Sequence, residues 1–331
     1  MGATTWALLV LAVSGCTEGA VELLDQDCGG TDPDVLRECV DADRYWSLLE
    51  EIAVPRPPGS SGWRQVGDRC ASGFEAAGFS VERQDYGTGV NIIGRLEGSG
   101  DGGMVVVSAH YDHIPDCPGA DDNASGVAGV LEAARVLGGA EWERNLVVAC
   151  WDEEEDGLIG SDAWTDEARE NDEEIEAAFV FEMIGYYDDT PGSQDLPPGL
   201  GIVFPQLAAV EANDNRGDFI MLVSDYASAD HTAAFAAHAA AIGLSEIALE
   251  LTAFQMETDI LAVLRRSDHA RFWEEGYPAI MLTDTAEYRN EAYHCRNGDD
   301  TVDRLDRDFA TAIVSATVGA AAQALGTPDT P

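Results

Sequence analysis

Short apolar runs that alternate with helical segments constrain this fold more than any other feature of the sequence. Runs bounded by turn residues are typical of buried strands in a mostly parallel sheet. Between them, residues 43–53, 63–79 and 127–137 carry apolar side chains at helical spacing. The alternation predicts one α/β domain with helices on both faces of a sheet. The expected strands are VNIIGRLEG (90–98), MVVVSAH (104–110), NLVVACW (145–151), AAFVFEMIG (177–185) and YPAIMLTDT (277–285).

The N-terminal residues predict export. WALLVLAVSGC (6–16) is too short to span a bilayer as a helix and resembles the apolar core of a secretory signal. VSGC also resembles the bacterial lipoprotein signal, in which the cysteine carries the lipid. Residues 1–16 are therefore expected to be a signal peptide. The mature protein would be secreted, or held on a bacterial membrane through a lipid at Cys16.

The rest of the chain divides into a tether and one folded domain. Residues 17–41 have little periodicity and are expected to be a tether, and residues 42–327 are expected to form the domain. Within it, residues 185–250 are expected to be an irregular insertion with one alanine-rich helix. The 62 acidic residues against 18 basic ones give a net charge of −44, which argues against nucleic acid as a partner.

The cysteine content suits an exported protein, although spacing alone does not fix the pairing. Cys28 and Cys39 are close enough for a local disulfide. Cys150 lies within an apolar strand and is expected to be a buried free thiol. Cys117 and Cys295 lie in polar loops, where they could pair or remain free.

Acidic and histidine residues follow four of the expected strands. His110 and Asp112 end one strand, a run of acids from residue 152 follows a second, Glu182 a third, and His294 lies in the loop after a fourth. Ligands of open α/β sheets bind at the carboxyl ends of the strands. This pattern predicts a metal site there. Asp122 precedes a helix and could simply cap it, but capping does not account for His110.

The motifs HYDHIPDCPGADDNASG, WDEEEDGLIGS, FEMIGYY, RSDHARFWEEGYPAIMLTDT and YHCRNGDDT resemble, in order, those of the co-catalytic zinc aminopeptidases, metallopeptidase family 28. The resemblance spans about residues 87–306. It implies a single α/β domain with a mixed, mostly parallel sheet of about eight strands flanked by helices. Residues 42–327 would then be a zinc peptidase domain.

The resemblance also implies a set of ligands for two zinc ions. His110 and Glu182 match ligands of the first zinc. Glu155 and His294 match ligands of the second zinc, and Asp122 matches the carboxylate that bridges both ions.

Further roles follow from the same motifs. Glu154 matches the general base, although Glu153 makes a run of three glutamates and leaves an alternative register. Asp112 matches the carboxylate that fixes the tautomer of the ligating His110. His269 is expected to be structural or near the site rather than a ligand. His113, His231 and His238 are expected on the surface or in loops.

The implied function is hydrolysis of N-terminal residues from peptides with a free N-terminus. Two zinc ions would activate a water, and a glutamate would accept its proton. Two alternatives remain on the same fold: a glutaminyl cyclase-like acyltransferase with one zinc, and a non-catalytic binding protein. Carboxypeptidase activity is also open.

Overall fold

The computed structural model describes residues 28, 30–100 and 102–328, and the expected signal peptide and Cys16 lie outside them. An eight-stranded mixed sheet runs through the described chain in the order β1-β2-β4-β3-β5-β8-β6-β7. The pairs β3–β4, β3–β5, β5–β8 and β6–β7 are parallel, and the other neighbours are antiparallel. The strands are β1 (Ser80–Asp85), β2 (Val90–Leu96), β3 (Met104–His110), β4 (Asn145–Trp151), β5 (Ile175–Phe181), β6 (Ile220–Asp225), β7 (Glu246–Leu251) and β8 (Ala279–Thr283).

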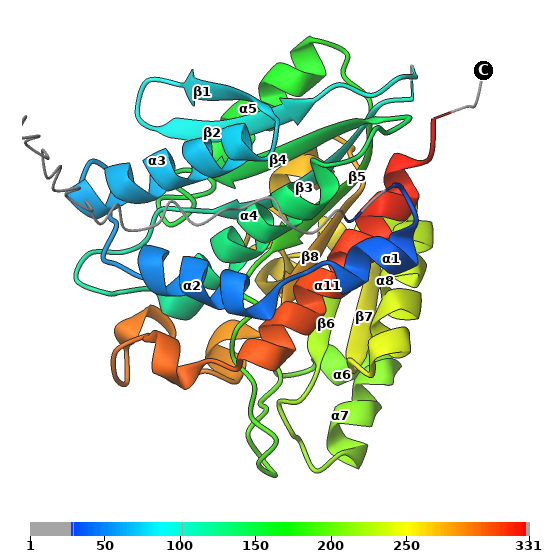
Figure 1. The fold of residues 1–331 in the computed structure, drawn as a ribbon. Helices are drawn as coiled ribbons and strands as arrows, with labels where there is room; N and C mark the ends of the chain where they lie inside the picture. Colours follow the sequence, from blue (N-terminus) through cyan, green and yellow to red (C-terminus); the bar gives the residue numbers. More distant parts are fainter. Residues whose placement is uncertain (1–27, 29, 101, 329–331) are drawn as a thin grey trace, which may run out of the picture.

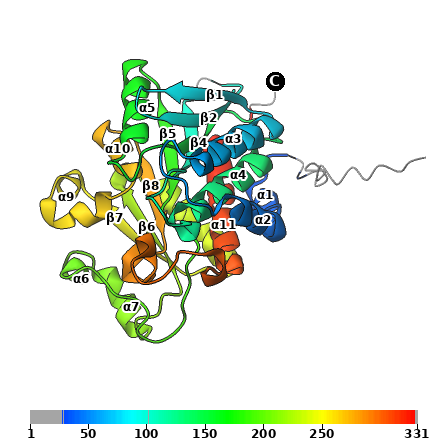
Figure 2. The ribbon, with the colours of Figure 1, turned by 90° about the vertical axis from the view of Figure 1, so that its left-hand side faces the viewer.

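Helices cover both faces of the sheet, as predicted (Figures 1 and 2). Alternate residues of β3 show why: Val105 and Val107 pack into one apolar core, and Met104 and Val106 into the other. One face carries α1 (Pro33–Glu38), α2 (Ala42–Ile52), α3 (Ser61–Ala76), α4 (Gly126–Leu137), α8 (Ala229–Ile242) and α11 (Arg307–Leu325). The opposite face carries α5 (Ile159–Glu170), α6 (Leu200–Val203), α7 (Ala208–Ala212), α9 (Ala253–Met256) and α10 (His269–Glu274).

Helix α11 belongs to the core. Among the described helices it is long and apolar enough to cross a membrane, but 72% of its apolar window is buried inside the fold. It packs against α1, α4 and α8. Its apolar character therefore reflects contact with neighbouring helices and the sheet.

Three sequence-based expectations are wrong. Residues 185–250 are not an irregular insertion, because β6 and β7 extend the sheet there. Part of the expected tether is folded: α1 is capped by Asp32, packs on α11, and is tied down by the expected Cys28–Cys39 disulfide. Cys150 is buried but not free, because α3 brings Cys70 against β4 to form a disulfide with it.

The topology brings four strand ends together. The central strands β4, β3, β5 and β8 all run parallel, so their carboxyl ends meet at one edge of the sheet. Residues that follow these ends in sequence therefore become neighbours in space.

Candidate metal centre

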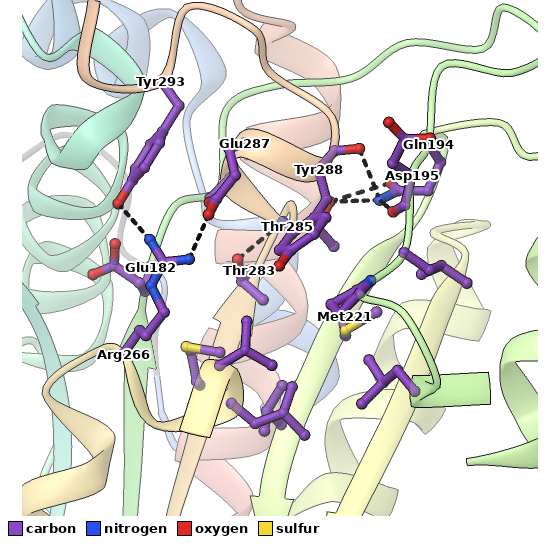
Figure 3. Close-up of a pocket in the computed structure, with 18 residues that line it drawn as sticks. Glu182, Gln194, Asp195, Met221, Arg266, Thr283, Thr285, Glu287, Tyr288 and Tyr293 are labelled. Atoms are coloured by element: carbon purple, nitrogen blue, oxygen red, sulfur yellow. Dashed lines mark hydrogen bonds and ion pairs between the residues drawn. The ribbon is translucent and has the colours of Figure 1, made fainter. Parts of the chain in front are cut away.

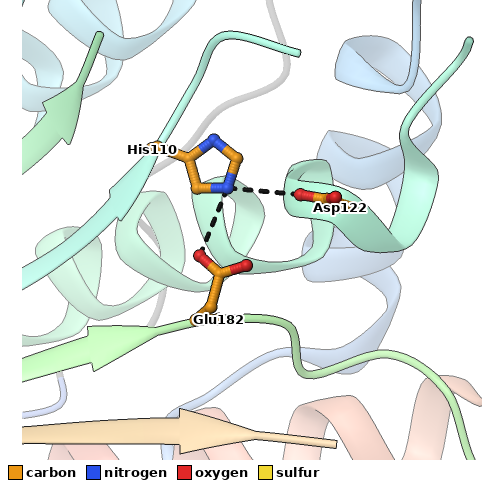
Figure 4. A group of neighbouring side chains, drawn as sticks. All are labelled: His110, Asp122 and Glu182. Atoms are coloured by element: carbon orange, nitrogen blue, oxygen red, sulfur yellow. Dashed lines mark ion pairs between the residues drawn. The ribbon is translucent and has the colours of Figure 1, made fainter. Parts of the chain in front are cut away.

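The first group of side chains lies where β3 and β5 end. His110 Nε2 is 3.2 Å from Asp122 Oδ1 and 3.2 Å from Glu182 Oε2 (Figure 4). His110 ends β3, Glu182 directly follows β5, and Asp122 lies in the turn before α4. We call these three residues the His110 cluster.

A second group lies on the other oxygen of Asp122. His294 Nε2 is 3.1 Å from Asp122 Oδ2 and 3.1 Å from Glu155 Oε2. His113 Nδ1 is 2.7 Å from Glu155 Oε1 and 3.9 Å from Asp122 Oδ2. We call His113, Asp122, Glu155 and His294 the His294 cluster. Asp122 is shared by both clusters and faces each with a separate oxygen.

The position of His113 corrects the expectation from sequence. The sequence predicts it on the surface or in a loop; it does lie in the loop after β3, but it is fully buried within the His294 cluster. A histidine three residues after a strand end has no distinctive pattern in one sequence. The signal that could have indicated His113 is the sequence HYDH (110–113), in which two histidines flank one carboxylate.

The donor atoms suit a divalent cation. Imidazole nitrogens and carboxylate oxygens are the ligands that zinc takes in proteins. Each cluster contains three groups whose donor atoms lie within 4.8 Å of one another. Four of these buried atoms have no hydrogen-bond partner in the described part of the chain: His110 Nε2, His113 Nδ1, Asp122 Oδ1 and Glu155 Oε1. Buried polar atoms are nearly always paired, so a group of unpaired ones indicates a place for an ion.

The electrostatics of the protein alone point the same way. Burial by itself would raise the pKa of Asp122, but His113, His110 and His294 hold it well below its usual range. Burial would lower the pKa of His294, but Asp122 and Glu155 raise it to about 9. Protons on the imidazoles thus balance the carboxylates. A divalent cation would supply that charge instead and release protons as it binds.

Asp112 orders the glutamate run. Its carboxylate accepts hydrogen bonds from the backbone N–H groups of Glu154 (3.0 Å) and Glu155 (3.3 Å), and it lies 3.5 Å from His110 Nδ1. Glu153 points elsewhere and accepts a 2.6 Å hydrogen bond from Thr88. Glu155 thus lies in the His294 cluster, whereas His110 and Glu182 are the charged groups that act most strongly on Glu154.

The turn that carries Asp122 is fixed by residues that the sequence did not single out. The buried guanidinium of Arg56 donates to the carbonyls of Pro118 (2.7 Å), Gly119 (2.8 Å) and Asp122 (3.0 Å). Asp300 accepts a 3.1 Å hydrogen bond from the Asp122 N–H. Asp122 does not cap α4: the residue before that helix is Ser125, and the N–H of Gly126 donates to the side chain of Asn123 at 3.2 Å. The carboxylate of Asp122 is thus held for the two clusters.

The SDH motif supplies two further buried groups beside the site. Ser267 donates a 2.8 Å hydrogen bond to Glu182. Burial raises the pKa of Asp268 to about 7, against the opposing influence of His110. His269 lies behind the site, with Nε2 2.9 Å from the Leu264 carbonyl and its ring edge-on to Trp273. The geometry agrees with the structural role expected for His269.

A disulfide joins two loops of the site. Cys117, between His113 and Asp122, pairs with Cys295, the residue after His294. Of the two possibilities left open by the sequence, the structure has the paired one. The bond joins the loop that carries His113 to the loop that carries His294, and its two cysteines are 178 residues apart in the chain.

An apolar pocket opens beside Glu182 (Figure 3). Arg266 lies at its rim, paired with Glu287 at 2.5 Å and with the Tyr293 hydroxyl at 3.1 Å. Loop residues 194–200, from the segment expected to be an insertion, form one wall. The apolar lining consists of Leu196, Pro197, Leu200, Met221, Val223, Val263, Leu264 and Met281.

These features define an α/β protein with a candidate metal centre at the carboxyl ends of its central strands, and sequence comparison gives the family. The profile of Peptidase family M28 matches residues 91–321. The protein YfbL of Escherichia coli is 33% identical over 261 residues, which cover 74% of this chain and 75% of YfbL. A probable zinc metalloprotease of Pyrenophora tritici-repentis is 26% identical over 71% of this chain and 53% of its own length. The chain belongs to peptidase family M28.

Solved structures share the fold at low sequence identity. LapA aminopeptidase of Legionella pneumophila has a TM-score of 0.70 at 18% identity, over 98% of this chain and 81% of LapA. Glutaminyl cyclase of Porphyromonas gingivalis has a TM-score of 0.62 at 19% identity, over 86% of this chain and 99% of the cyclase. The eight-stranded mixed sheet flanked by helices is thus an architecture shared with both kinds of enzyme.

Proposed function

We propose that this chain is a dinuclear zinc aminopeptidase that removes N-terminal residues from peptides. The observation that carries the proposal is Asp122, whose two oxygens face two separate clusters of imidazole and carboxylate groups. Such a carboxylate suits two adjacent metal ions. His110 and Glu182 would hold one ion, and Glu155 and His294 the other. Bound zinc would polarise the scissile carbonyl and lower the pKa of a water.

Glu154 is the general base of this proposal. Burial raises its pKa well above the usual range, and Glu182 and Asp268 add to the rise against the influence of His110. A carboxylate tuned in this way accepts a proton from water and passes it to the leaving amine. The Asp112 carboxylate holds the Glu154 backbone and faces His110 Nδ1. Asp112 would thereby position both the base and a ligand.

The apolar pocket is the proposed site for the side chain of the N-terminal residue. It borders Glu182 and is lined largely by aliphatic groups and methionine. We therefore expect apolar N-terminal residues to be preferred. Carboxylates outnumber cations in the lining of the pocket, which includes Glu182, Asp195 and Glu287 against Arg266. The guanidinium of Arg266 is itself paired with Glu287. This charge favours a substrate with a free α-amino group over one presenting a carboxylate.

A glutaminyl cyclase-like acyltransferase is the second candidate, because the cyclase of Porphyromonas gingivalis shares the fold. That activity needs a single zinc held by Asp, Glu and His. A single zinc of this kind would occupy only one of the two clusters and would leave the other cluster, with its unpaired atoms, without a role. The aminopeptidase uses both clusters and is the stronger proposal.

Export is part of the proposal. The apolar N-terminal stretch and VSGC support a signal peptide with lipid at Cys16, and the disulfides support an oxidising compartment. Labelling with a radioactive fatty acid in a bacterial host tests the lipid. Label on the wild type but not on Cys16→Ser is expected. Equal labelling of both proteins would show that Cys16 does not carry the lipid.

Hydrolysis of aminoacyl-p-nitroanilides tests the function. Each substrate is paired with its N-acetylated form and assayed with chelator, then with zinc restored. Cleavage of the free-amine set alone, lost with chelator and regained with zinc, is expected. Cleavage of neither set by zinc-loaded protein, with cyclisation of N-terminal glutamine instead, would establish the second candidate.

A further inference from the structure

His113 is a buried histidine whose surroundings are those of a metal ligand. Its Nδ1 lies 2.7 Å from Glu155 Oε1 and 3.9 Å from Asp122 Oδ2, and its ring centre lies 5.8 Å from that of His294. Although Nδ1 and the Glu155 oxygen are close, the ring N–H is not directed at that oxygen, so neither ring nitrogen makes a hydrogen bond within the described residues. A buried imidazole in a structural role normally donates through one nitrogen and accepts through the other, as His269 does in part with Leu264.

The ring of His113 is held in place from several sides. Its backbone N–H donates a 3.3 Å hydrogen bond to the carbonyl of Arg56. Gly119, at φ +58°, passes so close to the ring that a Cβ there would lie 2.5 Å from His113 Cδ2. A glycine is required at this approach. The Cys117–Cys295 disulfide closes the same loop. The imidazole is therefore built into the site rather than resting there.

We propose that His113 Nδ1 is a further protein ligand of the metal in the His294 cluster. The inference rests on the proposed dinuclear centre. With His113, Asp122, Glu155 and His294, that metal would have four protein ligands, the number found in structural zinc sites. The metal of the His110 cluster would have three protein ligands, the number found in catalytic zinc sites, and could also bind a water.

The difference in the number of protein ligands between the two metal sites agrees with the surrounding structure. Among the charged groups that act on the Glu154 carboxyl, His110 and Glu182 act most strongly. The apolar pocket also borders Glu182 and not Glu155. The proposed base and the proposed substrate pocket thus lie on the side where a coordination position is free. The His294 cluster, with its second imidazole, serves to hold its ion and to orient Asp122.

Metal binding to the full-length protein tests the assignment without reference to turnover. Metal-free wild type, His113→Ala, His113→Asn and the control His231→Ala, on α8, are titrated with Zn²⁺ and with Co²⁺. X-ray absorption of the zinc-loaded proteins counts imidazoles. We expect three imidazoles shared by two ions in the wild type and His231→Ala. His113→Ala should show two, and its weaker site should lose more than the roughly 10–100-fold that an outer hydrogen-bond partner contributes.

The asparagine variant separates a ligand from a hydrogen-bond donor. Its amide N–H can donate a hydrogen bond to Glu155, but the amide cannot replace an imidazole ligand of zinc. Wild-type affinity in His113→Asn, or two imidazoles in the wild type, would overturn the inference. Circular dichroism of each metal-free variant establishes whether it is folded. If His113→Ala is unfolded, His113→Asn is used for the comparison with the wild type. Hydrolysis by a wild type that shows two imidazoles would support the aminopeptidase and exclude His113 as a ligand. Three imidazoles without hydrolysis would support His113 as a ligand and contradict the aminopeptidase.

Discussion

The buried guanidinium of Arg56 donates a 3.0 Å hydrogen bond to the backbone carbonyl of Asp122. Because the same guanidinium also binds the carbonyls of Pro118 and Gly119, one side chain fixes the whole turn that presents the shared carboxylate. The precision of the candidate metal centre therefore depends on a residue that touches no ligand atom.

Replacing Arg56 by lysine is expected to weaken zinc binding. A lysine ammonium is a compact donor and cannot span three carbonyls as the guanidinium fork does. We expect zinc affinity to fall on the order of 10–100-fold, the usual effect of losing a partner behind a ligand. Competition with a chromogenic chelator measures it. Arg64→Lys is the control, because Arg64 binds one carbonyl at the surface. Unchanged affinity in Arg56→Lys would contradict the positioning role.

Glu154→Gln is expected to lose turnover while retaining zinc. Removing a general base costs about 10²–10⁴-fold in rate, and Glu154 makes no contact with the ligand nitrogens at ion-pair distance. The matched control is Glu153→Gln, because Glu153 bonds to Thr88 instead. Rates with leucyl-p-nitroanilide and metal analysis decide between them. A near-normal rate in Glu154→Gln with loss in Glu153→Gln would shift the register of the glutamate run.

Narrowing the pocket is expected to change side-chain preference. Val263 lines the apolar pocket, so Val263→Phe should disfavour leucyl relative to alanyl substrates by about tenfold in kcat/KM, the lower end of what one methylene contributes in such a pocket. Val203→Phe, on α6 and outside the pocket, is the control. An unchanged ratio would show that the N-terminal side chain binds elsewhere.

The metal-free protein is expected to lose stability with rising pH through His294. Burial lowers its pKa, but Asp122 and Glu155 outweigh burial and raise the pKa from 6.5 to about 9. The folded state therefore binds this proton more tightly than the unfolded state. The stabilisation is complete below about pH 6.5 and is lost as the pH rises through about 9. Tm measured in chelator should fall across this window, and less so for His294→Asn. If Tm falls with pH equally in the wild type and in His294→Asn, the loss of stability does not come from His294.

The central strands could be predicted from sequence, but the sheet edges could not. The strands that end at the site are buried on both faces and are therefore continuous apolar runs. The edge strands β1 (SVERQD) and β7 (EIALEL) each have a polar face and do not stand out. β6 is apolar, but it pairs antiparallel with β8, a strand far along the chain, and this long-range pairing leaves no local signal in the sequence.

Within the site, the side chains that follow the strand ends could be predicted, and those that close around them could not. His110 and Glu182 follow buried strands directly, so their neighbourhood comes from the topology. His113 and Arg56 reach the site through the conformation of loops, which a single sequence does not encode in its periodicity. The same holds for the Cys70–Cys150 pair, which depends on how α3 packs against β4.

The Cys117–Cys295 bond couples the maturation of the centre to completion of the fold. It joins loops that precede α4 and follow β8, so most of the sheet must be in place before the two thiols can meet. For the exported peptidase proposed above, the loops that carry His113 and His294 would be joined only after the thiols reach an oxidising compartment. The proposed hydrolytic centre would then be completed late, which would limit cleavage of other peptides before export.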